Sequence, residues 1–384
     1  MVVLGATGSI GRQTLDVSWR HRDRFRIVAL AAGSDLDGLV ALARECGQRG
    51  VALQALGLER AADASRARDA LASVCPAARI EVGAGSAARL AGECAADAVV
   101  NGIVGAAGLD ASLATLAAGR RLALANKETL VIGAELVQRA LASGGELIPV
   151  DSEHSAALLC LGGRPASEVA RLTLTASGGP LRDHRNWRQA SVAEVLAHPV
   201  WAMGRRITVD SALLVNKALE LIEARALFGL DWSQLDAVIH PQARFHALVA
   251  FRDGALVAQA AAADMRLPIQ LALSWPEHWE GPVPPLAAPD LARLDFEAIA
   301  PGRFPAFDLG VAVGKAGGTA PCAYNAADEE AVAAFLDGRI PLGRVVEILE
   351  QVMAAHDREA VSSRAQLAAV DEWARRAARE RVAA

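Results

Sequence analysis

Aromatic residues and long apolar runs are scarce in this chain of 384 residues, of which 4% are aromatic. The sequence has no uncharged apolar run of about 18 residues, the length that a membrane-spanning helix needs. It begins with a strand pattern instead of a charged segment and a cleavage site, so no signal peptide is expected. These absences predict a cytoplasmic protein that does not contact a membrane.

Cysteines and blocks of like charge are also rare. The five cysteines are scattered and odd in number, without Cys-x-x-Cys spacing, so they indicate neither a disulfide framework nor a zinc site. The net charge is -5, and acidic and basic residues are interspersed. Because no basic block is available to bind a phosphate backbone, a nucleic-acid partner is not predicted.

Apolar residues, in contrast, make up 53% of the chain, and its length predicts about two or three packed domains. The first begins with an apolar strand at residues 1–4, the loop Gly5-Ala-Thr7-Gly8-Ser9-Ile10-Gly11 and an amphipathic helix. Glycines in this strand–turn–helix context let the backbone approach a pyrophosphate at the helix N-terminus. We therefore expect a dinucleotide loop; a glycine-rich turn without a ligand is the alternative.

The second strand, residues 26–32, ends at Gly33-Ser34-Asp35, where the adenosine ribose lies in such folds. A carboxylate there accepts from the ribose hydroxyls of NAD and repels the extra phosphate of NADP, whereas Ser34 and Arg12 offset that repulsion. The type of nicotinamide cofactor is left open by these residues.

Two later strands deliver polar residues at their carboxyl ends, where ligands bind in an open α/β sheet. The strand 121–125 leads into Asn126-Lys127-Glu128, for which surface capping by the amide or the acid is the alternative. The strand 146–150 leads into Asp151-Ser152-Glu153-His154. In an extended chain Asp151 and Glu153 share one side, so that both carboxylates can bind one divalent cation. Helix capping is the commoner role of such an aspartate, and the metal site depends on a third ligand.

The third ligand is expected from the helix that runs on from Asp210-Ser211 through LLVNKALELIEARALF. Asn216, Lys217 and Glu220 share one side of it, whereas its leucines and alanines face a core. Oxygen ligands such as Glu220 favour magnesium or manganese over zinc. With Ser177 of the loop 176–180, this helix predicts a site for a metal and a phosphorylated ligand.

The remaining segments are expected to support this site. Residues 181–200 resemble a lid, and residues 237–260 read as antiparallel strands in which neighbours satisfy His240 and His246. Residues 280–305 are proline-dense and predict a linker, and the rest is helical.

Other dinucleotide proteins fit less well. A short-chain dehydrogenase or sugar epimerase needs Tyr-x-x-x-Lys, but Asp328 follows the only tyrosine, Tyr324, at that spacing. A semialdehyde dehydrogenase needs a nucleophilic cysteine, but Cys160 lies in an apolar run. A non-catalytic dinucleotide sensor or scaffold of the same fold is the remaining alternative.

The motifs GATGSIG, ANKE, PVDSEH, ASGGP, HPVWAMG, VDSALLVNKALELIEA, HPQ, DMRLPIQ and NAADEEAV occur in the order typical of one family. With them the chain resembles the 1-deoxy-D-xylulose 5-phosphate reductoisomerase family over nearly its whole length. The resemblance implies an oxidoreductase of isoprenoid precursor synthesis that forms 2-C-methyl-D-erythritol 4-phosphate. In that reaction a metal stabilises the enolate of a retro-aldol cleavage, recombination follows, and NADPH reduces the product.

The family resemblance also implies an α/β architecture and a homodimer. Residues 1–149 would form a Rossmann-like parallel-sheet domain that binds NADPH, and residues 150–279 an α+β catalytic and dimerisation domain with a mobile lid at about 181–205. A proline-rich linker, 280–305, would lead to a C-terminal α-helical bundle, 306–384.

Site residues follow from the family's motifs. Cofactor contacts are implied for Thr7, Gly8, Ser9, Ile10, Gly33, Ser34, Asp35, Asn126, Glu128, Met203 and Gly204. Magnesium or manganese would bind Asp151, Glu153 and Glu220. The substrate phosphate would bind Ser177, Ser211, Asn216 and Lys217. Lys127, Ser152 and His198 would surround the reacting carbons, and Trp201 would cover the substrate. Catalytic roles are implied for Lys127, Asp151, Glu153, His198 and Glu220.

Three features depart from the family's usual sequence. Asp35 stands where asparagine is common, which leaves the preference for NADP open. Ala243 replaces the serine of His-Pro-Gln-Ser and removes its hydroxyl. Only four residues precede Gly5, so the first strand is expected to be short and the assigned start codon to be late.

Overall fold

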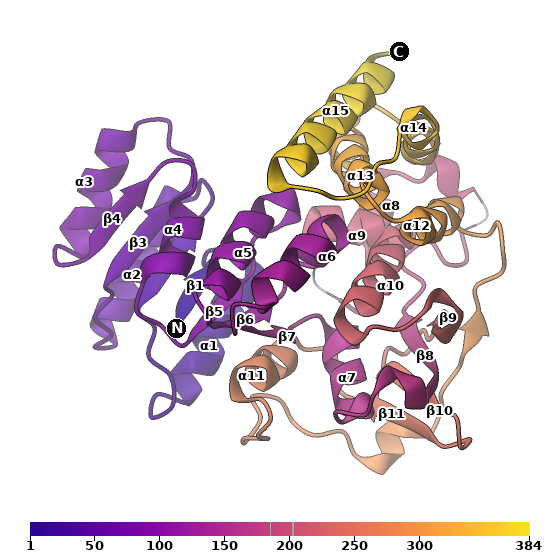
Figure 1. Cartoon of the computed structure of the whole chain (residues 1–384), viewed down its shortest axis with the longest axis horizontal. Helices are drawn as coiled ribbons and strands as arrows, with labels where there is room; N and C mark the ends of the chain where they lie inside the picture. The colour runs from indigo at the N-terminus through magenta and orange to yellow at the C-terminus, as the bar shows by residue number, and fades with distance from the viewer. Residues whose placement is uncertain (185, 202) are drawn as a thin grey trace. The chain divides into compact units, whose positions relative to one another are not determined.

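A parallel sheet of seven strands forms the centre of the first of two units into which the chain divides in the computed structural model (Figure 1). The structure describes residues 1–384 except residues 185 and 202. Unit 1 comprises Met1–Thr129, Glu135–Asp151 and Asp264–Pro284, and unit 2 comprises Leu130–Ala134, Ser152–Ala263 and Pro285–Ala384. No helix among the described residues has the length and apolar character to cross a bilayer.

The strand order of unit 1 is β4-β3-β2-β1-β5-β6-β7. Its strands are β1 (Val2–Leu4), β2 (Ala29–Ala32), β3 (Ala55–Leu58), β4 (Arg79–Val82), β5 (Ala98–Asn101), β6 (Arg121–Leu124) and β7 (Glu146–Pro149). Its helices are α1 (Ser9–Arg20), α2 (Leu36–Gln48), α3 (Ala64–Val74), α4 (Ser86–Glu93), α5 (Leu109–Ala117), most of α6 (Glu128–Leu141) and α11 (Arg266–Ser274). The order reverses between β1 and β5, which is where a doubly wound sheet binds ligands. The predicted Rossmann-like fold is confirmed.

Unit 2 contains a second sheet, of five strands in the order β11-β10-β8-β9-β12. These strands are β8 (Val169–Ala176), β9 (Leu235–Ile239), β10 (Phe245–Phe251), β11 (Leu256–Ala260) and β12 (Glu297–Ala298). Only β8 and β9 pair in parallel. Helices α7 (Ser152–Leu161) and α10 (Val215–Phe228) share an apolar core with this sheet, to which Leu172, Val249 and Leu221 contribute.

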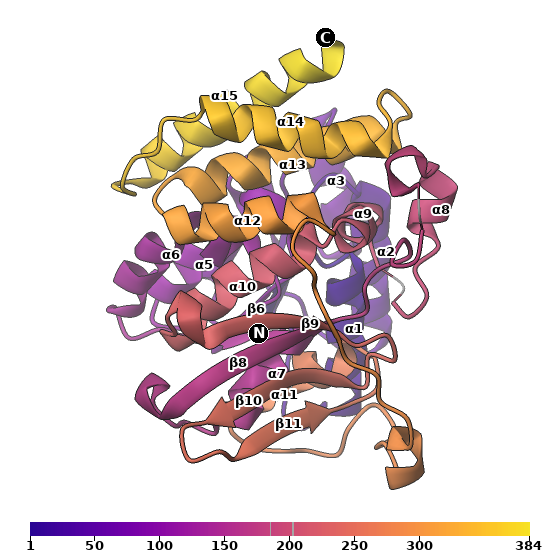
Figure 2. The ribbon, with the colours of Figure 1, turned by 90° about the vertical axis from the view of Figure 1, so that its right-hand side faces the viewer.

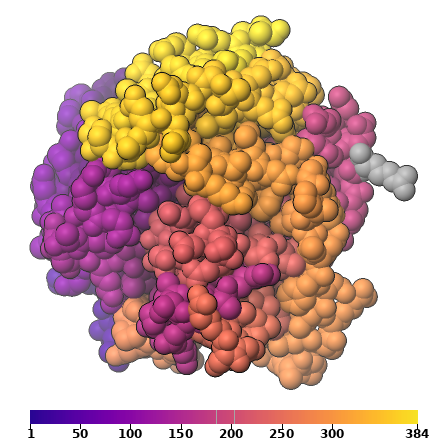
Figure 3. All heavy atoms as spheres, turned by 45° about the vertical axis from the view of Figure 1, so that its right-hand side comes forward, coloured from indigo at the N-terminus to yellow at the C-terminus, as the bar shows by residue number. Residues whose placement is uncertain are grey.

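A helical bundle completes unit 2. It consists of α12 (Pro305–Ala316), α13 (Ala320–Leu336), α14 (Leu342–Ala355) and α15 (Arg364–Ala383), which lie side by side in Figure 2 and form a continuous surface in Figure 3. Its core also receives Val209 of α9 (Arg205–Ala212) and Leu219 of α10. The predicted helical C-terminal region is therefore present, with α9 and α10 packed against it.

Two local expectations were wrong. The helix predicted to run on from Asp210 is broken: α9 ends at Ala212, and Leu214 adopts a φ of 54° before α10 begins. A left-handed leucine costs roughly 1–2 kcal/mol, and burial of its side chain in the sheet core offsets that cost. In addition, Asp151 and Glu153 do not lie in an extended chain, because α7 begins at Ser152.

The predicted linker 280–305 is partly ordered secondary structure: it contains a short 3-10 helix, Ala288–Leu291, and β12, which pairs with β9. Residues Asp264–Pro284 belong to unit 1, where α11 packs on α1. The boundaries 1–149, 150–279, 280–305 and 306–384 remain a prediction about domains.

A polar network joins α9 to the helical bundle. The guanidinium of Arg206 donates to Glu329 (2.9 Å) and Asn325 (3.0 Å), and it lies 3.4 Å from Asp328 and 3.5 Å from Asp210. Asp210 and Asp328 are buried, and burial raises the pKa of Asp328 to about 6. Arg206 therefore supplies positive charge to carboxyl groups that water does not reach.

Replacing Arg206 with methionine should lower the free energy of unfolding by about 3 kcal/mol, because it leaves buried carboxyl groups without their cation. Arg188→Met is the matched control, since Arg188 pairs with Glu347 at an exposed position. Its expected effect is within about 0.5 kcal/mol. Urea denaturation of both variants measures the difference, and equal losses would contradict the role given to the network.

Candidate active site

The predicted dinucleotide loop lies at the switch point of the unit 1 sheet. Gly5 has a φ of 70°, and a Cβ atom there would lie 2.6 Å from the carbonyl oxygen of Gly102, which follows β5. A Cβ atom at Gly11 would lie 2.5 Å from Ala6. Glycine is therefore required at both positions for the loop and α1 to pack closely. Gly8 caps α1 without a side-chain hydrogen bond, so the amides of its first turn can face an anion.

Asp35, at the expected ribose turn, caps a helix. Its Oδ1 accepts from the backbone N–H of Gly38 at 2.9 Å, so the carboxylate caps α2. Gly33, Ser34 and Asp35 are all exposed.

Asn126 and Glu128 are brought together, but both are buried. Asn126 donates to the carbonyl oxygen of Gly105 (2.9 Å) and to Glu128 (2.8 Å), which in turn accepts from the backbone N–H of Gly105 (3.1 Å). These contacts order the loop after β5, so their support for cofactor binding is indirect. Their predicted cofactor contacts remain a prediction.

Lys127 and Asp151 are also brought together within unit 1, from the carboxyl ends of the neighbouring strands β6 and β7. Nζ of Lys127 lies 2.5 Å from Oδ2 of Asp151, and both side chains are largely buried. A lysine and an aspartate placed in this way can orient polar groups of a substrate.

In unit 2, two glycines place Ser177 beside the end of α9. Gly178 and Gly179 have φ values of 86° and 69°, and a Cβ atom at Gly179 would lie 2.5 Å from the carbonyl oxygen of Ser211. The loop after β8 can therefore approach Ser211 only with glycine at this position. Ser211 lies in the last turn of α9 and not at the start of α10 as expected, because Leu214 ends the helix between them.

His198 joins the two serines. Its Nε2 lies 3.2 Å from Oγ of Ser177 and 3.2 Å from Oγ of Ser211. Its Nδ1 accepts from the backbone N–H groups of Val200 (3.2 Å) and Trp201 (2.9 Å), so the proton of the neutral ring is on Nε2. Burial lowers the pKa of His198, which favours this neutral ring.

The rest of the predicted lid, residues 181–205, includes α8 (Val192–Leu196), and its residues 185 and 202 lie outside the described residues. Trp201 is half-buried, with its ring centroid 6.0 Å from that of His246 in β10. Met203 and Gly204 belong to unit 2, and their predicted contacts with the cofactor remain a prediction.

Acidic and basic side chains converge between α7 and α10. Lys217 is buried, and its ammonium group donates to Oε1 of Glu153 (3.1 Å) and to Glu220. Asn216 donates to the other oxygen of Glu220, and Ser152 donates to Glu153 at 2.5 Å. Hydrogen bonds thus join four polar residues that were predicted to bind substrate or metal: Glu153, Asn216, Lys217 and Glu220. Ser152 lies at the edge of this group.

The position of Asp151, one residue before α7, extends this acidic group. Asp151, Glu153 and Glu220 each offer one carboxylate oxygen, and these oxygens lie within 4.8 Å of one another. Carboxylates at that separation suit a hard divalent cation.

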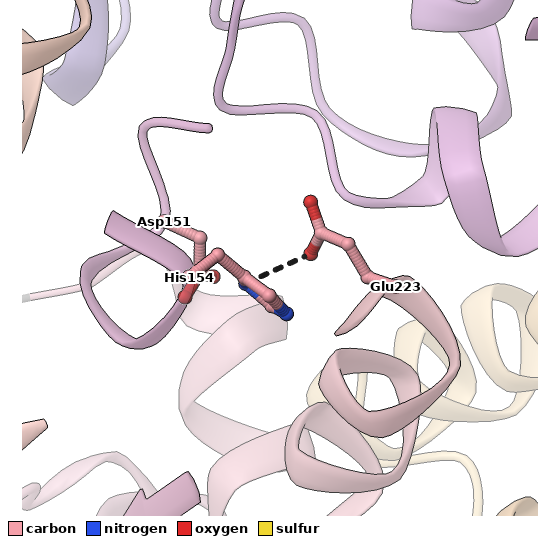
Figure 4. A group of neighbouring side chains, drawn as sticks. All are labelled: Asp151, His154 and Glu223. Carbon is pink, nitrogen blue, oxygen red and sulfur yellow. Dashed lines mark ion pairs between the residues drawn. The ribbon is translucent and has the colours of Figure 1, made fainter. Parts of the chain in front are cut away.

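His154 and Glu223 were missed in the sequence. Figure 4 shows them with Asp151, and Nδ1 of His154 lies 3.3 Å from a carboxylate oxygen of Glu223. Nε2 of His154 lies 2.9 Å from the backbone carbonyl of Glu220, which can only accept. This buried pair ties α7 to the turn of α10 that carries Glu220. The signal available in the sequence was their spacing from predicted ligands, since His154 follows Glu153 directly and Glu223 lies three residues after Glu220.

His240 and Ala243 lie in the turn before β10. As expected, neighbours satisfy His240: Nδ1 bonds to the carbonyl of Asp295 (2.8 Å) and Nε2 accepts from the N–H of Arg244 (3.1 Å). Ala243 is buried and has a φ of 45°, a conformation that an alanine adopts only at a cost.

Three family models match successive parts of the chain. Residues 1–134 match the model described as 1-deoxy-D-xylulose 5-phosphate reductoisomerase, and residues 147–228 match the C-terminal domain of that name. Residues 261–377 match the DXP reductoisomerase C-terminal domain.

Full-length relatives carry the same name. The chain is 45% identical over 380 residues to 1-deoxy-D-xylulose 5-phosphate reductoisomerase of Leifsonia xyli, covering 98% of this chain and 97% of the relative. It is 45% identical over 383 residues to that of Moorella thermoacetica, again covering 98% and 97%.

Solved structures of such enzymes share the fold. A DOX-P reductoisomerase in complex with NADPH, fosmidomycin and magnesium superposes with a TM-score of 0.91 at 34% identity, covering 99% of this chain and 97% of its own. The reductoisomerase from Zymomonas mobilis in complex with NADPH gives a TM-score of 0.89 at 36% identity, covering 99% and 98%.

The pKa of His198 predicts a pH dependence of stability. Because burial lowers this pKa in the folded protein, the unfolded chain takes up the proton first as pH falls. The neutral ring of His198 therefore contributes to the free energy of unfolding at pH values above about 6.5, the pKa of a histidine in the unfolded chain. This contribution is lost as the pH falls below that value. In His198→Asn, the free energy of unfolding should therefore fall less between about pH 7.5 and pH 5.5.

Urea denaturation at both pH values measures this difference. His278→Asn, the same substitution at an exposed position of unit 1, is the matched control. If His198→Asn loses as much stability on acidification as the unchanged protein, the neutral ring does not contribute.

Proposed function

The chain belongs to the 1-deoxy-D-xylulose 5-phosphate reductoisomerase family, and from this premise we propose that it converts 1-deoxy-D-xylulose 5-phosphate to 2-C-methyl-D-erythritol 4-phosphate. The reaction is a retro-aldol cleavage and aldol recombination followed by hydride reduction. The observation that carries the proposal is the convergence, within unit 2, of Glu153, Lys217 and Glu220 beside Asn216. A non-catalytic sensor needs no such group of charges, and the relatives from Leifsonia xyli and Moorella thermoacetica are both named as enzymes.

The proposed metal ligands are Asp151, Glu153 and Glu220. Support comes from the separation of their oxygens and from the excess of three carboxylates over the two ammonium groups of Lys127 and Lys217. Magnesium fits this oxygen donor set, and we propose that manganese can replace it. When bound, the cation would supply Lewis-acid polarisation of the substrate's oxygens.

The proposed phosphate site consists of Ser177, Ser211, Asn216 and Lys217. The two hydroxyls already share His198, and Lys217 brings a buried positive charge from the first turn of α10. Phosphate binding at this position holds the far end of the substrate, so that binding energy orients the reacting carbons. The Nε2 proton of His198 is available to the same ligand.

The groups proposed to surround the reacting carbons are Lys127, Ser152 and His198. Lys127 is fixed by Asp151, and the hydroxyl of Ser152 donates to Glu153, so the ammonium group is oriented as a donor and the serine oxygen as an acceptor before substrate binds. Trp201, already half-buried, is proposed to cover the substrate and exclude water that would intercept the cleaved fragments.

NADPH is the proposed cofactor, and it supplies the hydride. Support comes from the glycine loop at the switch point and the uncapped start of α1, at which Thr7, Gly8, Ser9 and Ile10 would contact the pyrophosphate. Gly33, Ser34 and Asp35 would lie at the ribose, Asn126, Glu128 and Gly204 would also contact the cofactor, and Met203 would lie near the nicotinamide.

The reaction is tested by adding the purified protein to 1-deoxy-D-xylulose 5-phosphate, magnesium and NADPH and following the nicotinamide absorbance. The expected result is substrate- and metal-dependent oxidation of NADPH. No oxidation with magnesium or with manganese would contradict the proposal. The same assay on cell fractions tests the predicted cytoplasmic location. The activity should be found in the cytoplasmic fraction and not in the membrane fraction.

Pairs of chains are proposed to form a homodimer through the edge strand β11. This strand ends the second sheet, and Leu256 and Val257 are exposed on it at 62% and 39%. An exposed apolar edge strand normally pairs or is covered. Light scattering should give twice the mass of one chain, and Val257→Lys should shift it toward the monomer; a monomeric unchanged protein would refute the pairing.

Glu220→Gln should weaken magnesium binding and reduce turnover by at least about 10- to 100-fold, since even outer partners of a metal have effects of that size. The amide oxygen keeps the hydrogen bond from Asn216, whereas the bond from Lys217 to the other oxygen is lost; Lys217 still donates to Glu153, so α10 should remain folded. Calorimetric titration with magnesium and the absorbance assay measure both effects. Glu168→Gln, at an exposed position, is the control, and unchanged magnesium affinity in Glu220→Gln would refute the ligand assignment.

A further inference from the structure

The end of β2 carries no acidic residue that is directed at a ribose. In dinucleotide folds a carboxylate at this position accepts from the ribose hydroxyls of NAD, and a nearby arginine takes its place in NADP enzymes. Here β2 ends at Ala32, and the exposed Gly33 follows. The first acid is Asp35, whose carboxylate is bound to the N-terminus of α2 through Gly38. The turn is therefore open to an anion.

Arg60 lies at the same edge of the sheet. Strand β3 runs parallel to β2, with Leu58 opposite Ala32, and the backbone N–H of Arg60 donates to the carbonyl oxygen of Gly33 at 2.8 Å. A methyl group placed on Gly33 would lie 3.7 Å from Nη2 of Arg60. Its guanidinium thus lies directly beside the ribose turn.

The guanidinium of Arg60 is also available. Arg60 is exposed, and within the part of the chain that the structure describes its side chain makes no hydrogen bond or ion pair. Arg12, the other arginine near the loop, donates its Nε to the carbonyl oxygen of Thr7 at 3.1 Å and so braces the loop.

We propose that Arg60, together with the hydroxyl of Ser34, binds the 2′-phosphate of NADPH and makes the protein select NADPH over NADH. This inference rests on the proposed function only in requiring a nicotinamide dinucleotide at the glycine loop. A guanidinium can donate two parallel hydrogen bonds to one phosphate, which gives both affinity and discrimination. Because Gly33 has no side chain, no Cβ atom separates the exposed turn from the guanidinium, and an anion bound over the turn is within reach of the exposed arginine.

Calorimetric titration with adenosine 2′,5′-bisphosphate and with adenosine 5′-monophosphate tests the inference without turnover. The unchanged protein should bind the bisphosphate more tightly. Arg60→Gln should weaken binding of the bisphosphate by about tenfold or more, the value of a hydrogen bond to a charged group, and leave that of the monophosphate unchanged. Arg44→Gln, which removes an exposed arginine from the middle of α2, is the matched control and should change neither.

The outcomes separate this inference from the proposed function. If the unchanged protein distinguishes the two nucleotides and Arg60→Gln still does so, Arg60 is not the phosphate ligand, whatever the enzyme assay shows. If Arg12→Gln abolishes the discrimination and Arg60→Gln does not, the inference is overturned in favour of Arg12. Active enzyme in which KM for NADPH rises in Arg60→Gln while KM for NADH stays constant would support it.

Discussion

The placement of a buried ammonium group between one buried and one partly buried carboxylate is the constraint on which the site depends. Lys217 and Glu220 come from one helix and Glu153 from another, and each charge needs the others because burial removes the water that would otherwise stabilise it. Helices α7 and α10 therefore have to meet at this point. The pair of His154 and Glu223 and the apolar core behind them fix the same contact.

A second constraint is steric. The loop after β8 reaches α9 only because Gly179 has no side chain, and α1 reaches its loop only because Gly11 has none. In both places a close approach of backbones brings polar groups together: Ser177 and Ser211 around His198 in one, and the first amides of α1 at the switch point in the other. Glycine at these two positions is therefore required for the neighbouring polar groups to come close together.

The helical bundle helps to position the site, because it makes polar contacts with α9, the helix that carries Ser211. Arg206 connects it to α9, and Asp210 precedes Ser211 in that helix. Since the carboxyl groups around Arg206 are buried, their charges hold α9 at a defined position on α13. Support from the bundle is therefore electrostatic as well as apolar.

The sequence by itself determined the doubly wound fold, the family and the set of polar residues, because the spacing of glycines, strands and motifs is local information. Helix periodicity placed Asn216, Lys217 and Glu220 on one side, and Glu220 was expected to be the third metal ligand beside Asp151 and Glu153. It did not predict the break at Leu214, which has no glycine or proline to mark it, nor the capping role of Asp35. Only the tertiary structure decided that His154 and Glu223 pair across two helices and that Arg60 lies beside Gly33. Those contacts join residues far apart in the chain, and packing between elements, which no local pattern encodes, brings them together.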